Sequence, residues 1–309
     1  MMQNLFILII SLFLIVKGGL LATKYAIKVA QNFRLSKFLV GLIIVSIISI
    51  LPETFIALNA SLAGLPAFGL GTLFGSNVAD LTLVFAIIIF LVGRGIKVEN
   101  KIIKNNRAFP YLFLIPIILG LDGYYSRVEG VILIIAGILF YYFSFRHNAH
   151  KKEDTNKHVH LIKNFCWLIF SMAILLVGAH FIVVSASELA KYWGINPILI
   201  GMLIVGIGTT IPEMIFALQS VKKNNDSLAV GDILGTVLAD ATVVVGLIVL
   251  VQPFIFPKKI IYVTAGFMLM AAFMLSYFMR TGKKLSHRES LLLFLFWLFF
   301  VLTEYLINK

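Results

Sequence analysis

Long apolar runs with almost no charge occupy most of the chain, and they constrain its fold more than any other feature. Of the 309 residues, 60% are hydrophobic and 13% are charged, with a mean hydropathy of +1.00. Such a chain cannot form mainly the surface of a soluble globule. Segments in lipid must satisfy their own backbone hydrogen bonds, and barrel strands would alternate over about ten residues. The sequence therefore predicts an all-α polytopic membrane protein.

Reading about 20 apolar residues per span divides the chain into ten predicted transmembrane helices. They are 4–30, 37–62, 67–93, 108–121, 127–145, 162–190, 196–221, 228–252, 260–279 and 288–307. The first is too long for a signal-peptide core and is expected to be retained. Cys166 is the only cysteine, so a disulfide or a cysteine metal site within one chain is excluded.

Basic residues are concentrated in the loops that follow odd-numbered spans, such as 94–107 and 146–161. The positive-inside rule then predicts both termini outside and the 146–161 linker in the cytoplasm. This distribution explains the net charge of +12 by topology, without a nucleic-acid partner. The linker's four histidines could bind a metal, although its charged composition favours a solvated connection.

The two halves of the sequence are copies of each other. A shift of 160 residues aligns "GLIIVSIISILPETFIAL" (41–58) with "GMLIVGIGTTIPEMIFAL" (201–218), and "GLGTLFGSNVADLTLV" (69–84) with "AVGDILGTVLADATVV" (229–244). Chance similarity between apolar helices does not explain the matched Pro-Glu pairs, glycines and aspartates. Five spans per copy is an odd number, so the copies must cross the membrane in opposite senses. We expect two inverted five-helix repeats, 1–145 and 162–309, with a binding site near the midplane.

Four acidic residues lie near the centres of apolar spans, where an ionised side chain costs a few kcal/mol or more unless it meets water, a partner or an ion. They are Glu53, Asp80, Glu213 and Asp240. A hydroxyl residue precedes each of them by four positions, a spacing that puts both on one helix face. These hydroxyls belong to Ser49, Ser76, Thr209 and Thr236.

Four copies of one oxygen pair predict a cage for a hard cation. Calcium takes six to eight oxygen ligands, and sulfur and imidazole are nearly absent from the centres of these spans. Pro52 and Pro212 each remove an amide donor, which would free carbonyls for the same site. The glycines expected to allow close helix approach or unwinding are Gly71, Gly75, Gly231 and Gly235. The alternative is a structural kink that carries a protonated or hydrogen-bonded carboxylate.

At these residues the chain resembles the cation/calcium exchanger superfamily, particularly its prokaryotic sodium/calcium exchangers. Family members carry two inverted repeats with motifs like "GTSLPE" and "GNxxGSNxxD/N". Here "GTTIPE" (208–213) matches the first motif and "FGSNVAD" (74–80) the second. The resemblance covers the whole chain and implies a non-enzymatic antiporter without a cofactor that exchanges Ca²⁺ for Na⁺ by alternating access. It also implies a prokaryotic cell membrane as the location.

The resemblance also implies individual roles. Glu53 and Glu213 fall on the central calcium-binding glutamates, and Asp80 and Asp240 on the acidic or amide positions beside them. The positions associated with sodium or calcium through a hydroxyl are Ser49, Ser76, Thr209, Thr210 and Thr236.

The chain departs from the family pattern in both repeats. Ile48 and Ile50 replace a glycine and a hydroxyl residue in the first, while Asp232 and Val237 each stand where the second motif has Asn. These changes leave the sodium stoichiometry open.

Several alternatives remain at this stage. Four acids around one dication leave excess negative charge, which keeps proton-coupled exchange of Ca²⁺ or another divalent cation open. A cation channel is a remoter possibility, because an inverted repeat around broken helices favours carriage over an open pore. An intramembrane aspartyl protease is remoter still, because it explains neither Pro-Glu copy nor the hydroxyls. Lys17 could pair with an acid or extend toward an interface, and His180 is expected between helices. The oligomeric state is not indicated.

Overall fold

The computed structural model describes residues 36–98, 108–148, 161–192, 194, 206–282 and 284–308, together with individual helical positions between 6 and 28. Its α-helices are α2 (Lys37–Leu39), α3 (Ser46–Ser49), α4 (Leu51–Leu62), α5 (Pro66–Ala79), α6 (Phe85–Val92), α8 (Phe109–Leu112), α9 (Leu114–Leu119), α10 (Arg127–Asn148), α11 (Leu161–Tyr192), α13 (Gly206–Lys222), α14 (Asp226–Ala239), α15 (Val245–Val251), α16 (Gly266–Gly282) and α17 (His287–Asn308). The π-helical segments are η1 (Val40–Val45), η2 (Asp80–Val84), η4 (Asp240–Val244) and η5 (Ile260–Ala265).

Six helices of the described part are long and apolar enough to cross a membrane, and each begins and ends within two residues of a predicted span. They are Lys37–Leu62, Pro66–Val92, Arg127–Arg146, Asp226–Val251, Ile260–Thr281 and His287–Ile307. The shorter apolar helix Phe109–Leu119 lies in the fourth predicted span. About half of the first predicted span, residues 196–205 of the seventh and residues 149–160 of the linker lie outside the described residues. The arrangement of ten spans in two inverted repeats remains a prediction.

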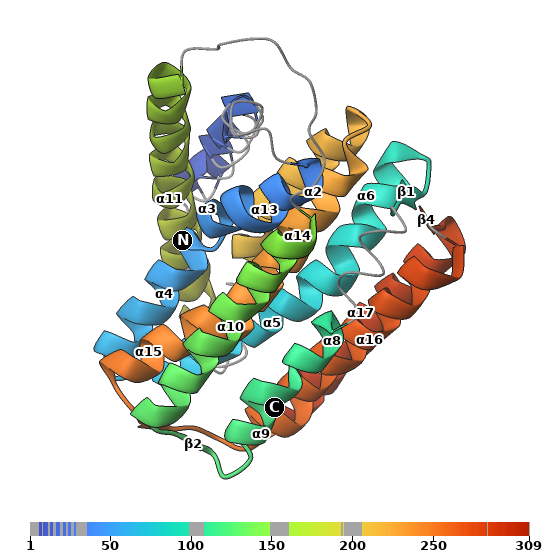
Figure 1. The fold of residues 1–309 in the computed structure, drawn as a ribbon. Helices are drawn as coiled ribbons and strands as arrows, with labels where there is room; N and C mark the ends of the chain where they lie inside the picture. The colour runs from blue at the N-terminus through green and yellow to red at the C-terminus, as the bar shows by residue number, and fades with distance from the viewer. Residues whose placement is uncertain are drawn as a thin grey trace.

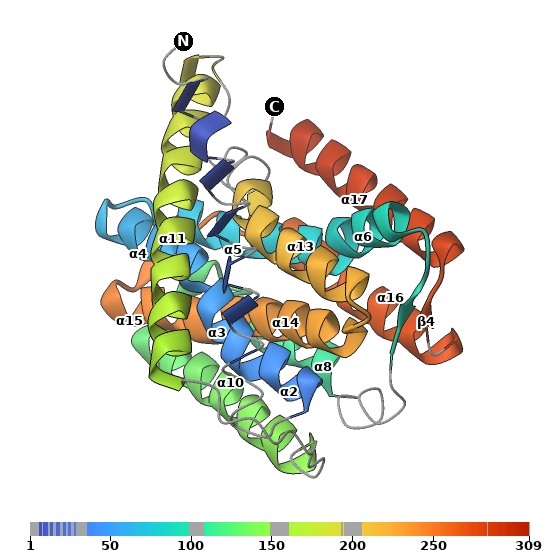
Figure 2. The ribbon, with the colours of Figure 1, turned by 90° about the horizontal axis from the view of Figure 1, so that it is seen from above.

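Elements of the second half recur at the 160-residue offset found in the sequence. Helix α14 begins 160 residues after α5 and has the same length of 14 residues. The segments η4 and η2 keep the same offset, as do the 22-residue helices α17 and α10. In both views α11 lies on the side of the molecule away from α16 and α17 (Figures 1 and 2).

Among the residues that the structure describes there are four two-residue strands, which the all-α prediction did not include. Strand β1 (Ile96–Lys97) pairs antiparallel with β4 (Lys284–Leu285), and β2 (Tyr124–Tyr125) pairs antiparallel with β3 (Phe254–Ile255). Each pair joins one strand from either half, and the two pairs lie at opposite ends of the molecule (Figure 1). Backbone amides that leave a helix need partners, and here the connections of the two halves supply them to each other.

Glycines allow the helix that begins at Lys37 to approach α14 backbone to backbone. A Cβ added to Gly41 would lie 2.7 Å from the amide nitrogen of Asp232, and one added to Gly235 would lie 2.6 Å from Cβ of Ser46. Gly231 faces the backbone of Phe38 and Leu42 in the same way. The predicted close approach is confirmed for Gly231 and Gly235, and Figure 2 shows α2 and α3 beside α14.

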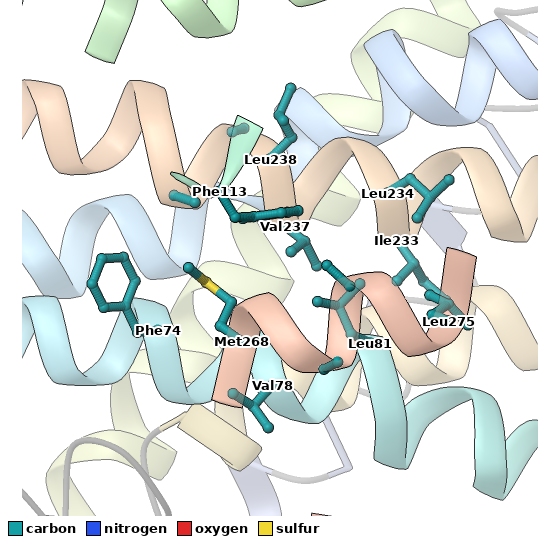
Figure 3. Packing of buried hydrophobic residues seen from close by; sticks show 14 of the residues in the cluster. Phe74, Val78, Leu81, Phe113, Ile233, Leu234, Val237, Leu238, Met268 and Leu275 are labelled. Atoms are coloured by element: carbon teal, nitrogen blue, oxygen red, sulfur yellow. The ribbon is translucent and has the colours of Figure 1, made fainter. Parts of the chain in front are cut away.

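Apolar side chains fix α5, α14 and α16 against one another (Figure 3). The buried contributors drawn there include Phe74, Val78 and Leu81 from α5 and η2, Ile233, Val237 and Leu238 from α14, and Met268 and Leu275 from α16. This packing fixes the relative positions of α5 and α14, which also carry buried polar side chains.

An ion pair joins the two halves at the end of the molecule that carries β1 and β4. The Arg94 guanidinium donates to both carboxylate oxygens of Asp226, at 2.7 and 2.8 Å, and the amide of Lys97 donates to one of them at 2.8 Å. Asp226 is the first residue of α14, so this contact sets where that helix begins relative to β1. The carboxylate also raises the pKa of Arg94, which stays charged.

Candidate cation site

The two glutamates of the repeated Pro-Glu motif are both buried. Glu53 lies in the first turn of α4, immediately after the helix is interrupted at Ile50, and is 1% exposed. Glu213 lies within the continuous helix α13 and is 0% exposed. Oε2 of Glu53 and both carboxylate oxygens of Glu213 have no hydrogen-bond partner among the described residues. Three buried acceptor atoms, contributed by both halves, are therefore available to a ligand.

Asp80 and Asp240 hold matching positions, each as the first residue of a π-helical segment. A π segment inserts a residue into the helix and often marks a functional site. Their side chains are 1% and 0% exposed. Within the described part of the chain, Oδ1 of Asp80 and both oxygens of Asp240 lack a hydrogen-bond partner. The aspartates thus add unpaired acceptors to those of the glutamates.

The predicted hydroxyls differ in their contacts. Thr209 hydrogen-bonds to the Glu53 carboxylate and Thr210 to the Asp80 carboxylate, so α13 reaches the acids of the other half. Ser76 donates to the carbonyl of Leu73 at 3.0 Å.

The two remaining hydroxyl residues belong to α3 and α14. Ser49 donates to Oδ1 of Asp232 at 3.1 Å. Oγ1 of Thr236 has no hydrogen-bond partner among the residues that the structure places. All five predicted hydroxyl residues lie in the apolar segments that carry the acids, and Ser49 lies in the same segment as Glu53, Lys37–Leu62.

The carboxylates lie within electrostatic reach of one another across the two halves. Coulomb repulsion acts on the Glu213 carboxylate from Glu53, Asp80 and Asp232. It acts on the Asp240 carboxylate from Glu53 and Asp80. Like charges in a buried volume repel strongly unless cations or protons neutralise them. The arrangement can therefore hold cations, and its charge must be balanced by whatever it binds.

The oxygen atoms available to a cation here are of several kinds: carboxylate, hydroxyl and carbonyl. Within the described ranges no group of three or more His, Cys, Asp or Glu side chains is assembled to hold a metal ion. Calcium also accepts hydroxyl and carbonyl oxygens, so a cation between Glu53 and Glu213 would draw on Thr209 as well. Pro212 has no N–H group to donate to the carbonyl of Gly208, which adds another possible oxygen.

The two prolines act differently, although the repeat predicts equal disturbance of both helices. The helix of the first half is interrupted at Ile50, just before Pro52, and α4 begins anew. In the second half α13 runs without interruption through Pro212. Pro52 stands at the start of its helix, where a missing amide is tolerated.

Asp232 was not among the cation ligands predicted from the sequence. Its side chain is 0% exposed, and Oδ2 has no partner within the described residues. The signal was its spacing, since Asp232 precedes Thr236 by four residues and Asp240 by eight, which puts all three on one helix face.

Lys17 and His180 do not belong to the site. Lys17 is exposed, and its Nζ lies 5.5 Å from the centre of the Phe13 ring. His180 is also exposed and contacts Phe181 edge to face, with ring centres 5.5 Å apart. The expectation that His180 lies between helices is therefore wrong.

The geometry defines an integral membrane protein with a buried, acidic, oxygen-rich site formed by both halves. The family model described as "Sodium/calcium exchanger protein" matches residues 3–146 and again 163–306. The chain belongs to this family of membrane antiporters.

The chain is also similar to named relatives, and it shares its fold with a solved structure. The "Inner membrane protein YrbG" of Escherichia coli is 27% identical over 80% of this chain and 79% of its own. The "Sodium/calcium exchanger MaX1" of Methanosarcina acetivorans is 23% identical over 98% of this chain and 99% of its own. A structure of the sodium-calcium exchanger NCX_Mj, soaked with Na⁺ and Sr²⁺, superimposes with a TM-score of 0.81 at 22% identity, covering 96% of this chain and 97% of that one. The chain shares that fold.

Proposed function

We propose that this protein is a secondary antiporter that exchanges Ca²⁺ for Na⁺ by alternating access. The observation that carries the proposal is the set of unpaired, buried glutamate oxygens contributed by Glu53 of one half and Glu213 of the other. Two carboxylates match the charge of one calcium ion, and the hydroxyls beside them supply neutral oxygen ligands. The printed name of the relative MaX1 supports the same substrates.

The recurrence of elements at an offset of 160 residues supports ten spans in two inverted repeats. Helix α10 packs on α15, and the equivalent helix α17 packs on α6, so the halves make reciprocal contacts. Reciprocal contacts are those expected of a pseudo-two-fold axis. In this arrangement the site lies at the midplane, the repeats are residues 1–145 and 162–309, and the 146–161 linker is cytoplasmic with both termini outside.

Coupling follows from the charge of the site. When calcium leaves, the carboxylates of Glu53 and Glu213 face each other's repulsion in a buried volume, which other cations relieve. Sodium ions that enter from the opposite side of the membrane neutralise the same oxygens and cannot share them with calcium. When the site holds calcium or sodium, the protein can therefore change the side of the membrane to which the site opens. When the site is empty, the repulsion between the carboxylates opposes this change.

A proton-coupled exchange of calcium is the second candidate, and the number of buried acids favours it. Asp80, Asp232 and Asp240 add three carboxylates to the two glutamates, more negative charge than one calcium ion balances. Protons on some of these acids would restore neutrality.

Calcium uptake into proteoliposomes distinguishes the two. An outward sodium gradient and an outward proton gradient are compared at matched membrane potential, with Glu213→Gln as the inactive control. Uptake that follows sodium and is lost in Glu213→Gln supports sodium/calcium exchange. Uptake that follows only protons favours the second candidate, and the absence of gradient-driven flux of any divalent cation refutes both.

A further inference from the structure

Strands β1 and β4, one from each half, place two lysines directly opposite each other. Ile96 lies opposite Leu285, and Lys97 lies opposite Lys284. Ile96 and Leu285 are 0% exposed and point into the molecule, whereas both lysines are exposed and point away from it. Residues paired in this way have Cβ atoms about 4.5–5.5 Å apart. The strand pair therefore brings two ammonium groups together at the surface.

Within the described ranges, no acidic side chain forms an ion pair with either lysine. Asp226 lies close by, because it accepts a hydrogen bond from the Lys97 amide at 2.8 Å, but both of its carboxylate oxygens are bonded to the Arg94 guanidinium. Like charges directly opposite each other destabilise a strand pair. An anion between the lysines would remove this repulsion and add an attraction to each ammonium group.

Further basic side chains surround the lysine pair. Arg94 donates to a carbonyl in the last turn of α13 at 2.7 Å, which places the exposed Lys222 and Lys223 near the start of β1. Arg288 is exposed in the first turn of α17, three residues after β4. The acid of that turn, Glu289, points back to the helix start, where it accepts hydrogen bonds from the amide and hydroxyl of Ser286 at 2.7 Å. The surroundings therefore favour an anion.

The strand pair at the other end of the molecule has no such arrangement. There Tyr124 lies opposite Ile255, and Tyr125 lies opposite Phe254. Pairing of strands between the halves thus does not by itself require facing lysines. The positive-inside rule accounts for basic residues in the connections that carry β1 and β4, but not for two that face each other.

The lysine pair lies where membrane-spanning helices end. β1 begins four residues after the span Pro66–Val92, and β4 lies between the spans Ile260–Thr281 and His287–Ile307. Figure 1 shows both strands beside the ends of α6, α16 and α17. Charged groups so close to the end of an apolar span lie at the level of the lipid headgroups.

The adjoining helix ends expose apolar side chains that acyl chains can cover. Phe90 and Leu91, in the last turn of α6, are 80% and 54% exposed, and Leu291 and Leu292 of α17 are 58% and 51% exposed. A ligand with a negative headgroup and apolar chains therefore fits this place better than a free inorganic anion does.

We propose that Lys97 and Lys284 form a binding site for the phosphate group of an anionic phospholipid, which links the two halves at this end of the molecule. A phosphate group carries several acceptor oxygens, so it accepts hydrogen bonds from both ammonium groups at once. In the topology proposed above this end faces the cytoplasm, where the membrane surface is negative. The site does not depend on the ions that the protein exchanges.

Melting temperatures of the purified full-length protein in detergent test the site. Phosphatidylglycerol, phosphatidylcholine and inorganic phosphate are added separately. We expect phosphatidylglycerol to raise the melting temperature of the wild type by about 2–4 °C more than phosphatidylcholine does. Inorganic phosphate should raise it less, and a rise equal to that with phosphatidylglycerol would overturn the assignment to a lipid.

Lys97→Gln and Lys284→Gln should each lose at least about half of the rise caused by phosphatidylglycerol. Neither variant should melt below the wild type in phosphatidylcholine, because each removes the repulsion between the two lysines. Lys258→Gln, which changes an exposed lysine beside β3, is the matched control and should keep the full rise. An equal rise in all three variants would show a general attraction of lipid to the basic protein and overturn the site. Loss in only one of the two ladder variants would contradict a site shared by both lysines.

Native mass spectrometry counts the lipid directly. The wild type should retain one more phosphatidylglycerol molecule than the double variant Lys97→Gln/Lys284→Gln, and equal numbers would overturn the proposal. Neither measurement requires ion flux, so failure of this site leaves the proposed exchange untouched, and failure of exchange leaves the site untouched.

Discussion

Two substitutions that break the Arg94–Asp226 ion pair, one at each residue, should destabilise the protein by different amounts. The Asp226 side chain is 9% exposed, whereas that of Arg94 is 32% exposed. Arg94→Ala leaves a nearly buried carboxylate with the Lys97 amide as its remaining partner in the described structure. Asp226→Asn leaves a guanidinium that water can reach and that still donates to the carbonyl of Val221 at 2.7 Å. We therefore expect Arg94→Ala to be the more harmful change.

The loss of unfolding free energy expected from these substitutions lies between two limits. Removing one partner of a buried pair costs about 3–5 kcal/mol, whereas exposed pairs contribute about 0–1 kcal/mol. One partner here is nearly buried and the other is about a third exposed, so water screens part of the attraction. We expect Arg94→Ala to lower the free energy of unfolding by about 2–3 kcal/mol and Asp226→Asn to lower it by about 1–2 kcal/mol. The double variant should be no less stable than Arg94→Ala, because the uncompensated carboxylate is then absent.

Unfolding by sodium dodecyl sulfate in mixed micelles, followed by circular dichroism, measures these differences. The four proteins of the cycle give the coupling free energy between the two side chains, expected at about 1–2 kcal/mol. If the two single changes are additive, or if Asp226→Asn is the more destabilising, the asymmetric burial of the pair does not govern its contribution.

Two further predictions concern packing and capping. Gly235→Ala should reduce the yield of monodisperse protein and its melting temperature, because the new Cβ meets Ser46 at 2.6 Å; Gly266→Ala, which meets nothing within 4 Å, should be tolerated. A melting temperature for Gly235→Ala equal to that of Gly266→Ala would contradict the close helix crossing. Ser126→Ala and Ser286→Ala should each cost about 0.5–2 kcal/mol of unfolding free energy, because both hydroxyls hydrogen-bond to the glutamate three residues later. The same detergent titration measures both losses of unfolding free energy. A loss in only one of the two variants would show that Ser126 and Ser286 do not cap their helices equivalently.

Span boundaries were predictable because the membrane imposes one simple rule on composition. Each of the six long apolar helices begins and ends within two residues of the predicted span, since lipid excludes the polar residues that flank it. The buried acids were predictable for the same reason: Glu53, Glu213 and both repeated aspartates stand out in apolar surroundings.

Other features depend on contacts between segments far apart in sequence. The strand pairs β1–β4 and β2–β3 join connections of different halves, so no local pattern announces them. The π segments at Asp80 and Asp240 depend on where one extra residue is accommodated, which residue propensity does not fix. Asp232 was visible as a departure from a motif, but its hydrogen bond to Ser49 depends on the crossing of two helices.

In the sequence "GDILGTVLAD" (231–240), residues that allow close packing and residues proposed to bind cations share one helix. Small residues recur at Gly231, Gly235 and Ala239, and each is followed at once by a polar residue. Neighbouring residues differ by about 100° around a helix, so the small and polar residues form two adjacent rows. The glycine row brings the helix of Ser49 within contact distance, and this closeness lets Ser49 reach the first residue of the polar row. Substitutions in the glycine row should therefore act on folding first, whereas those in the polar row should act on cation binding in a folded protein.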